Sequence, residues 1–325
     1  MSDQWRVFDL VEAFQLSYAV ATLHNLGVFT TLKEPATADE LSARYSLDPS
    51  LLRGTLEYVA TCTDLLRKSG ERFVATRNYS DGSRFLLDLY VGAYGGNAAQ
   101  LAKLLRRPSK APAAVDRVSH ARAFEAVAGL ALGALPKLIR QLEFNHLLDL
   151  GCGNGALLLE LAAQDPDFFG LGIDLNSAMC KVARARLRTA RMSSRVRVMR
   201  GDCRNLSALL PDKVSAMVRA VTACNVANEM FAEGHSRAIA WLRGLRQVLP
   251  GRPLLIADYY GRLGQKKERP SRETLLHDYA QLISGQGVPP ATRAEWRSIY
   301  SHAGCRLVHI FEDKATTRFI HILRL

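Results

Sequence analysis

The feature that most constrains the fold is a glycine-rich turn between an apolar run and a helix-like pattern. Residues 147–150 read Leu-Leu-Asp-Leu, residues 151–155 read Gly-Cys-Gly-Asn-Gly, and a Leu/Ala pattern with helical period begins at Ala156. This order predicts a strand, a tight turn and a helix. Glycines allow positive φ and bring backbone amides close to a ligand, and the new helix presents unpaired N–H groups. The stretch therefore predicts a binding site for a polar or anionic group.

The first apolar run contains Asp149, and two further apolar runs along the chain also end in an acid. Residues 168–175 include Asp174 and residues 196–203 include Asp202. An acid at the tip of the second strand can accept hydrogen bonds from both hydroxyls of a ribose. A turn without a ligand is one alternative, and a dinucleotide site is another because the turn also fits G-x-G-x-x-G/A. The dinucleotide alternative gives no reason for Asp149 or Asp202.

The three acids and the glycines together resemble the class I S-adenosylmethionine-dependent methyltransferases, whose motif is D-x-G-x-G-x-G. The resemblance implies S-adenosyl-L-methionine as cofactor, Asp174 as the ribose acid, and an adenine-side acid after the third strand. The residues that it assigns to the cofactor are Asp149, Gly151, Gly153, Gly155, Asp174, Leu175, Asp202 and Cys203.

The remainder of the chain predicts an α/β fold. At 325 residues, about two domains are expected. We expect strands near residues 146–150, 169–174, 196–201, 214–224 and 253–258, with helices between them, and a terminal hairpin of 305–312 and 316–325 around the turn Asp313-Lys314-Ala315. The resemblance implies a Rossmann-like seven-stranded methyltransferase sheet whose last strand inserts antiparallel beside strand five.

Residues 1–80 predict short helices and a small hairpin. Gly27 fits a helix C′ position, Thr37 and Glu40 form a capping box, and Pro49 fits the first position of a helix whose apolar face is Leu51, Leu52, Leu56 and Val59. The pattern resembles the winged-helix dimerisation domain of small-molecule O-methyltransferases and implies a homodimer. A DNA-binding winged helix is disfavoured, because the second helix offers Arg53, which Glu57 offsets. Residues 81–145 are expected to be helical, and the resemblance implies that they link the two domains and form part of the substrate wall. It also implies that residues 146–325 form the catalytic domain.

Charge and cysteine content bear on the binding partners and the cellular location of the protein. The net charge is +12, and the segment from Lys181 to Arg200 holds eight basic residues and no acid. Such a segment can bind nucleic acid but is more often a solvated helix face. Scattered cysteines without a CxxC pair, no secretory signal and no membrane-length apolar run favour a cytoplasmic protein.

The acceptor end of the site is less defined. Substrates of this fold lie beyond the ends of strands four and five, here near residues 224–231 and 257–260. Plant-type O-methyltransferases carry a His-Asp pair after strand four, and this chain has Asn228-Glu229 instead. Asp258 and His277 are further candidates, and would be our choice for a metal centre if the enzyme resembled α-keto acid C-methyltransferases, although we expect no metal. Residues Tyr90, Tyr94, Phe124 and Glu125 are candidates for substrate contact or, preferably, helix packing.

These observations favour a methyltransferase that acts on a small metabolite in natural-product (antibiotic) biosynthesis, with O-methylation first. The absent histidine keeps C-methylation of an α-keto acid or similar activated carbon open. A nucleic-acid methyltransferase would rest on the basic segment alone. A non-catalytic cofactor-binding protein is the fourth alternative, since some members of the family keep the fold and lose the reaction.

Overall fold

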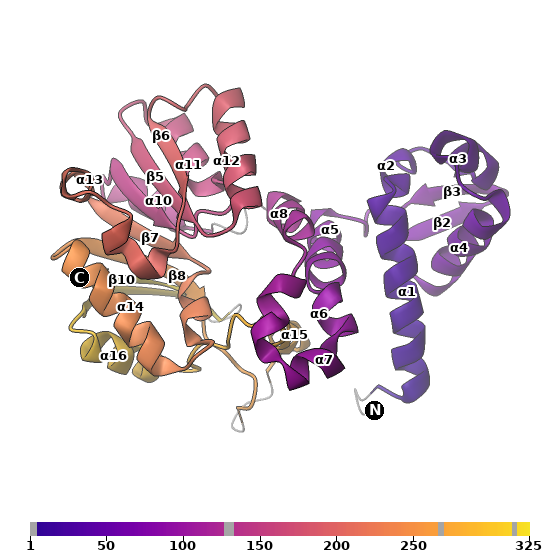
Figure 1. The fold of residues 1–325 in the computed structure, drawn as a ribbon. Helices are drawn as coiled ribbons and strands as arrows, with labels where there is room; N and C mark the ends of the chain where they lie inside the picture. The colour runs from indigo at the N-terminus through magenta and orange to yellow at the C-terminus, as the bar shows by residue number, and fades with distance from the viewer. Residues whose placement is uncertain (1–4, 127–132, 266–269, 314–316) are drawn as a thin grey trace. The chain divides into compact units, whose positions relative to one another are not determined.

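The computed structural model describes residues 5–126, 133–265, 270–313 and 317–325 (Figure 1). The chain forms two compact units. One comprises Met1–Gly95 with Arg122–Val127, and the other comprises Gly96–Ala121 with Ala128–Leu325. The boundaries expected at residues 80 and 145 stay predictions.

The first unit combines helices with a three-stranded antiparallel sheet of order β1-β3-β2. Its elements are α1 (Val7–Asn25), α2 (Val28–Thr31), β1 (Ala36–Thr37), α3 (Ala38–Tyr45), α4 (Pro49–Cys62), β2 (Leu66–Ser69), β3 (Arg72–Ala75), α5 (Asp81–Leu86) and the π-helix η1 (Leu87–Ala93). Gly27 lies just beyond α1 with a φ of 78°, and the Thr37–Glu40 capping box opens α3. Pro49 begins α4. These predicted helix boundaries and the predicted hairpin are confirmed.

The apolar face predicted for α4 needs one correction. Leu52, Leu56 and Val59 are buried, whereas the side chain of Leu51 is 74% exposed. Positions 52, 56 and 59 recur at the four- and three-residue spacing that keeps side chains on one helix face. Leu51 lies about 100° away from Leu52 around the helix axis and faces solvent.

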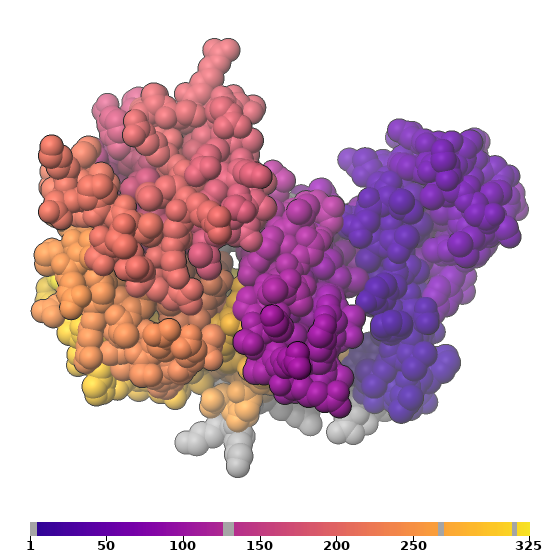
Figure 2. Space-filling view, in the orientation of Figure 1, coloured from indigo at the N-terminus to yellow at the C-terminus, as the bar shows by residue number. Residues whose placement is uncertain are grey.

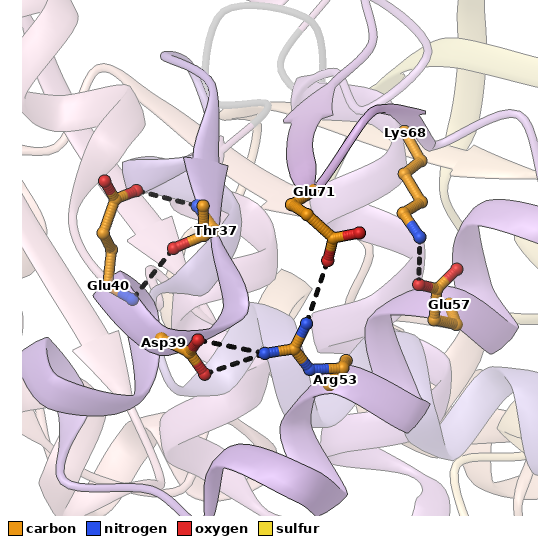
Figure 3. Close-up of polar contacts among 7 residues, drawn as sticks. All are labelled: Thr37, Asp39, Glu40, Arg53, Glu57, Lys68 and Glu71. Atoms are coloured by element: carbon orange, nitrogen blue, oxygen red, sulfur yellow. Dashed lines mark hydrogen bonds and ion pairs between the residues drawn. The ribbon is translucent and has the colours of Figure 1, made fainter.

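Ion pairs neutralise the charges around α4 (Figure 3). Arg53 pairs with Asp39 at 2.9 Å and with Glu71 at 3.0 Å, and Lys68 on β2 pairs with Glu57. The sequence suggested that Glu57 offsets the charge of Arg53. In the structure, Asp39 and Glu71 do so instead. Because these cations are already paired, α4 and its hairpin offer little positive charge to a DNA backbone.

A polar chain joins α1 to η1 within the same unit. The Tyr79 hydroxyl lies 2.6 Å from His24 Nδ1, and His24 Nε2 lies 3.2 Å from the buried carboxylate of Asp88. The second oxygen of Asp88 accepts a hydrogen bond from Arg122 Nε at 3.1 Å. Tyr94 is buried and Phe124 packs edge-on against Phe85, which supports packing roles for these aromatic residues.

The second unit begins with helical segments and continues as a seven-stranded sheet of order β6-β5-β4-β7-β8-β10-β9. The helical segments are α6 (Gly95–Ala99), α7 (Leu101–Arg106), the 3₁₀ helix η2 (Pro108–Ala114) and α10 (Leu135–Gln141). The first part of α8 (Arg117–Ala126) belongs here as well, whereas its residues from Arg122 on belong to the first unit. The strands are β4 (His146–Leu150), β5 (Phe169–Asp174), β6 (Val196–Arg200), β7 (Ala220–Cys224), β8 (Pro253–Tyr259), β9 (Arg306–Asp313) and β10 (Arg318–Arg324). β10 runs antiparallel to both β8 and β9, as predicted. Lys314 and Ala315 of the predicted hairpin turn lie outside the described residues.

Helices cover both faces of this sheet (Figure 1). Apolar residues of α10, α11 (Ala156–Gln164) and α12 (Ser177–Thr189) pack with Leu147 and Leu255 on one face. Those of α13 (Asp212–Met217), α14 (His235–Val248) and α16 (Arg293–His302) pack with Leu148 and Ile256 on the other face. Figure 2 shows the same view in space-filling form, with the orange atoms of the part of the chain around α14 in front. Neighbouring strand residues therefore alternate between two cores.

One predicted strand starts later than expected. The segment 214–224 was expected to be a strand throughout, but its first residues belong to α13, and β7 begins at Ala220. Pro211 precedes the helix and Asp212 lies in its first turn, where an acid is favoured.

No helix in the described part of the chain combines the length and apolar character needed to cross a lipid bilayer.

The burial difference within α4 gives a stability prediction. We expect Leu56→Ala to lower the free energy of unfolding by about 2–5 kcal/mol, because it removes a fully buried side chain and leaves a cavity. Leu51→Ala, the matched control, should change it by less than about 0.5 kcal/mol. Urea unfolding followed by circular dichroism measures both variants, and equal effects would contradict the assigned helix face.

Candidate functional site

The predicted cofactor residues gather at one edge of the sheet. β4, β5 and β6 are parallel neighbours, so their carboxyl ends lie together. Asp149 lies near the end of β4, Asp174 ends β5, and Asp202 follows β6. In open α/β sheets, ligands bind beyond this edge.

The glycine turn after β4 requires residues without side chains. Gly151, Gly153 and Gly155 all have positive φ, between 53° and 74°. A Cβ on Gly151 would lie 2.2 Å from Cγ2 of Val226, and one on Gly155 would lie 3.2 Å from Cβ of Ala183. The turn therefore keeps bare amides at the edge of the sheet, which fits a cofactor that approaches the backbone closely.

Asp174 ties the turn to the end of β5. Its Oδ2 accepts a hydrogen bond from the Gly153 amide at 2.9 Å, and its Oδ1 accepts one from the Asn176 amide at 2.7 Å. Desolvation raises the pKa of this carboxyl group, while the two amides oppose the shift. The side chain is partly exposed, so it can still meet a ribose hydroxyl.

Asp149 is buried beneath the turn. Its Oδ1 accepts a hydrogen bond from the Thr222 hydroxyl on β7 at 2.7 Å. Burial raises the pKa of Asp149 to about 7, and the Asp174 carboxylate adds to this rise. A cationic group of a ligand would stabilise the ionised form of Asp149.

Asp202, Cys203 and Leu175 complete the predicted cofactor end. Arg204 forms an ion pair with Asp202 at 2.7 Å and holds the pKa of its carboxyl group below the usual value. Burial raises the pKa of the Cys203 thiol to about 12, so the thiol is neutral. Leu175 is 57% exposed just beyond β5, where it can cover an apolar ring.

The acceptor candidates lie beyond β7 and β8. Asn228 and Glu229 are on the 3₁₀ helix η4 (Ala227–Phe231). Asp258 accepts hydrogen bonds from the backbone amides of Asn228 and Tyr259, both at 3.0 Å. Burial raises the pKa of Asp258 to about 7. With both oxygens bonded to amides, Asp258 fixes the start of η4 against β8.

Asn228 and Glu229 have different surroundings. The Asn228 side chain is buried and donates from Nδ2 to Gln281 Oε1 at 3.0 Å, so this donor is engaged inside the protein. Glu229 is accessible to solvent and accepts a hydrogen bond from Gln286 Nε2 at 3.0 Å. Surrounding atoms partly desolvate Glu229 and raise the pKa of its carboxyl group. This shift brings a carboxylate closer to the range suited to a general base.

His277 lies on α15 (Arg272–Ile283), which begins after the cap Ser271 as the sequence predicted. Its ring packs edge-on against Tyr259, with ring centroids 4.8 Å apart. Burial lowers the pKa of His277 to about 4, so the imidazole is neutral at neutral pH. Within the described ranges no group of three or more His, Cys, Asp or Glu side chains could hold a metal ion.

Sequence reasoning missed the residues that support this site. Thr222 on β7 bonds Asp149, and Gln281 and Gln286 bond the residues of η4. A polar residue in an otherwise apolar strand was a usable signal for Thr222. The two glutamines lie more than 50 positions from their partners, and no local pattern marks them.

Arginines of the basic segment bond to the main chain. Arg184 donates to Val198 O and Arg186 to Asn154 O, and Arg195 donates to Ala162 O and Asp165 O at the end of α11. Unpaired carbonyl groups at helix ends need such donors. These contacts assign part of the charge to the fold itself.

Comparison with known proteins places this geometry in a wider context. Residues 147–246 match the family of methyltransferase domains. The mitomycin 7-O-methyltransferase MmcR is 19% identical with a TM-score of 0.76, and the match covers 98% of this chain and 96% of that chain. The N,N-8-amino-8-demethyl-D-riboflavin dimethyltransferase RosA from Streptomyces davawensis is 23% identical with a TM-score of 0.63, over 98% and 96% of the two chains. CalO1, a methyltransferase in calicheamicin biosynthesis solved in its SAH-bound form, is 18% identical with a TM-score of 0.63, over 98% and 96%. At these identities the structural matches show the shared fold.

The buried Asp149 predicts pH-dependent cofactor binding. With a pKa of about 7, Asp149 is protonated in the free protein at lower pH, and at the predicted cofactor site it would have to lose that proton to balance an ammonium group. We expect the affinity for S-adenosylhomocysteine to fall by up to about tenfold per pH unit below pH 7. Isothermal titration at about one pH unit below and one above this pKa of about 7 measures the effect.

Two variants separate Asp149 from its neighbours. Asp149→Asn should bind weakly with a flat pH profile. Asp258→Asn removes the other acid whose pKa is about 7, and it should keep the pH dependence of the unmodified protein. An unmodified protein whose affinity does not change with pH would contradict the role of Asp149.

Proposed function

We propose, from the match of residues 147–246 to the family of methyltransferase domains, that this protein transfers a methyl group from S-adenosyl-L-methionine to a small metabolite of natural-product biosynthesis. The main support for this proposal is the hydrogen bond between the glycine turn and Asp174, with Asp149 and Asp202 at the same edge of the sheet. We propose O-methylation as the reaction. The mitomycin enzyme, which has the same fold, is named as an O-methyltransferase.

The proposed cofactor residues fit an adenosyl ligand by their chemistry. Asp174 can accept hydrogen bonds from ribose hydroxyls, and Leu175 can cover the adenine ring. Asp149 can balance an ammonium group, and the bare amides of the turn allow close approach. When bound, the cofactor supplies an activated methyl group on a sulfonium. The protein then has to orient the acceptor and exclude water.

Glu229 is the group that we propose as general base. Among the described residues its side chain accepts one hydrogen bond, from the neutral amide of Gln286 to Oε1, which leaves Oε2 available. Asp258 differs, because backbone amides occupy both of its oxygens. We therefore assign Asp258 and Asn228 to positioning η4, and we place His277 in the wall of the acceptor site.

C-methylation of an α-keto acid stays a second candidate, because no histidine occupies the position after β7 where the plant-type enzymes carry their base. A carboxylate base at Glu229 can remove a proton from either oxygen or an acidic carbon.

Nucleic acid is a poor acceptor candidate, since several arginines of the basic segment bond to main-chain carbonyls. All six cysteines are free thiols, which supports our proposal of a cytoplasmic location.

A labelled-methyl assay tests the proposed function. The protein is incubated with methyl-labelled cofactor and pools of small phenols, enols and amines, and the labelled product is analysed for the position of the methyl group. Asp174→Ala serves as the cofactor-binding control and should show neither binding nor transfer. Cofactor binding without transfer to any pool would favour a non-catalytic binding protein.

The role of Glu229 gives a kinetic prediction. Glu229→Gln should lower kcat by about 10²–10⁴-fold, because it removes the base while keeping the size of the side chain. The dissociation constant for S-adenosylhomocysteine should stay unchanged. Glu233→Gln, which alters a surface partner of Arg237, is the matched control and should leave kcat unchanged. Wild-type kcat in Glu229→Gln would exclude Glu229 as the base.

We also propose a homodimer through the first unit. An exposed apolar face runs along the first half of α1 at helical spacing, formed by Val7, Phe8, Val11, Phe14 and Tyr18. Leu51 at the start of α4 is exposed as well. Contiguous apolar faces of this kind mark interaction surfaces, and two copies of one helix face can pair about a two-fold axis.

A charge on this face should prevent association. We expect the unmodified protein to be a dimer at micromolar concentration, and Phe14→Glu to be a folded monomer because the dimer would bury the new carboxylate. Leu105→Glu changes an exposed leucine of α7 and should remain dimeric. Light scattering coupled to size exclusion measures the mass, and a monomeric unmodified protein would contradict the proposal.

A further inference from the structure

Arg318 brings a positive charge to the acceptor side of the sheet edge. It is the first residue of β10, and its register partner on β8 is Tyr259. Because β10 runs antiparallel to β8, it begins where β8 ends. Arg318 therefore lies at the edge that carries the cofactor residues and η4, although it comes from the last strand of the chain.

A hydrogen bond fixes the guanidinium group toward β7. Arg318 Nη1 donates to Asn225 Oδ1 at 2.9 Å. Asn225 directly follows β7 with a φ of 52°, and its amide donates to Ala257 O at 2.8 Å. The next residue, Val226, is the one whose side chain fills the space above Gly151. Arg318 is thus bonded to the same short loop that closes on the cofactor turn.

Arg318 differs from nearby arginines because it forms no ion pair among the described residues, although Asp313 is its register partner on β9. Arg204 pairs with Asp202, and Arg293 pairs with Glu312. Among the residues that the structure describes, the bonded partner of Arg318 is the neutral Asn225 amide, and none of the ion pairs includes Arg318. An exposed guanidinium that is oriented but not neutralised retains donors for an anion.

Arg318 lies near two neutral titratable groups and near Asp258, whose pKa its positive charge lowers against the effect of burial. His277 and the Cys224 thiol are neutral at neutral pH, because burial lowers the pKa of His277 to about 4 and raises the pKa of Cys224 to about 12. Asp258 points both oxygens at backbone amides, and burial raises its pKa to about 7. An acceptor with a negative group would complete this charge balance.

We infer that Arg318, held by Asn225, binds a carboxylate of the methyl acceptor and makes anionic acceptors the preferred substrates. The planar guanidinium suits two parallel hydrogen bonds to a carboxylate. This inference rests on the proposed function, because it gives a substrate class to the same site. The amino-acid carboxylate of the cofactor is the other source of this chemistry. The sheet order disfavours it, because the cofactor acids lie on β4 to β6 and β10 lies on the far side of β7 and β8.

The test compares an acid with its amide on the full-length protein. Salicylate and salicylamide, which have nearly the same size and differ in charge, are titrated into protein saturated with S-adenosylhomocysteine. We expect the unmodified complex to bind salicylate at least about tenfold more tightly than salicylamide, the difference expected for one charged hydrogen-bonded pair. Arg318→Gln should remove this preference, and Arg318→Lys should retain part of it.

Controls separate the outcomes. Arg324→Gln changes the exposed arginine at the other end of β10, which bonds Gly251 O, and should leave the preference unchanged. Equal affinities for the two probes in the unmodified protein, including no binding of either, would overturn the inference. So would an unchanged preference in Arg318→Gln. Weaker S-adenosylhomocysteine binding in Arg318→Gln would assign the arginine to the cofactor carboxylate instead. Failure of the unmodified protein to bind S-adenosylhomocysteine would refute the proposed function itself.

Discussion

The hydrogen bond from the Gly153 amide to Asp174 is the interaction on which the site depends. It joins the turn after β4 to the end of β5 at 2.9 Å, across 21 positions of sequence. The turn can reach Asp174 only because its glycines take positive φ and leave room for Val226 and Ala183. A side chain in place of Gly151 or Gly155 would therefore disturb the turn that holds the amide against Asp174, whatever the polarity of that side chain.

The two ends of this edge have opposite electrostatic character. At the cofactor end, Asp149 and Asp174 are desolvated acids with raised pKa values, a suitable setting for a cationic ligand. At the acceptor end, Arg318 faces a neutral amide, a neutral imidazole and a neutral thiol. Desolvated acids at one end, and at the other a guanidinium that forms no ion pair among the described residues, suit a positively charged ligand beside a negatively charged one.

The sequence predicted the parts of the fold that follow from local patterns. The glycine turn, the caps of α3 and α4 and the terminal hairpin each depend on residues a few positions apart, and the structure contains them. The prediction for Leu51 was wrong because Leu51 is apolar and adjacent to the buried Leu52, and it was therefore assigned to the same helix face. The contacts of Arg318 could not be predicted, because Asn225 lies 93 positions away and meets it only through the order of the sheet.

The contacts of charged residues also could not be predicted from the sequence. The basic segment from Lys181 to Arg200 suggested a surface for an anionic partner, since sequence alone counts charges without their contacts. In the structure, Arg195 donates to two carbonyl groups at the end of α11, where unpaired acceptors and the helix dipole both favour a cation. An arginine used in this way stabilises the sheet layer. Anion binding is therefore better assigned to Arg318, which lies at the edge of the sheet and forms no ion pair among the described residues, than to the segment with the most positive charge.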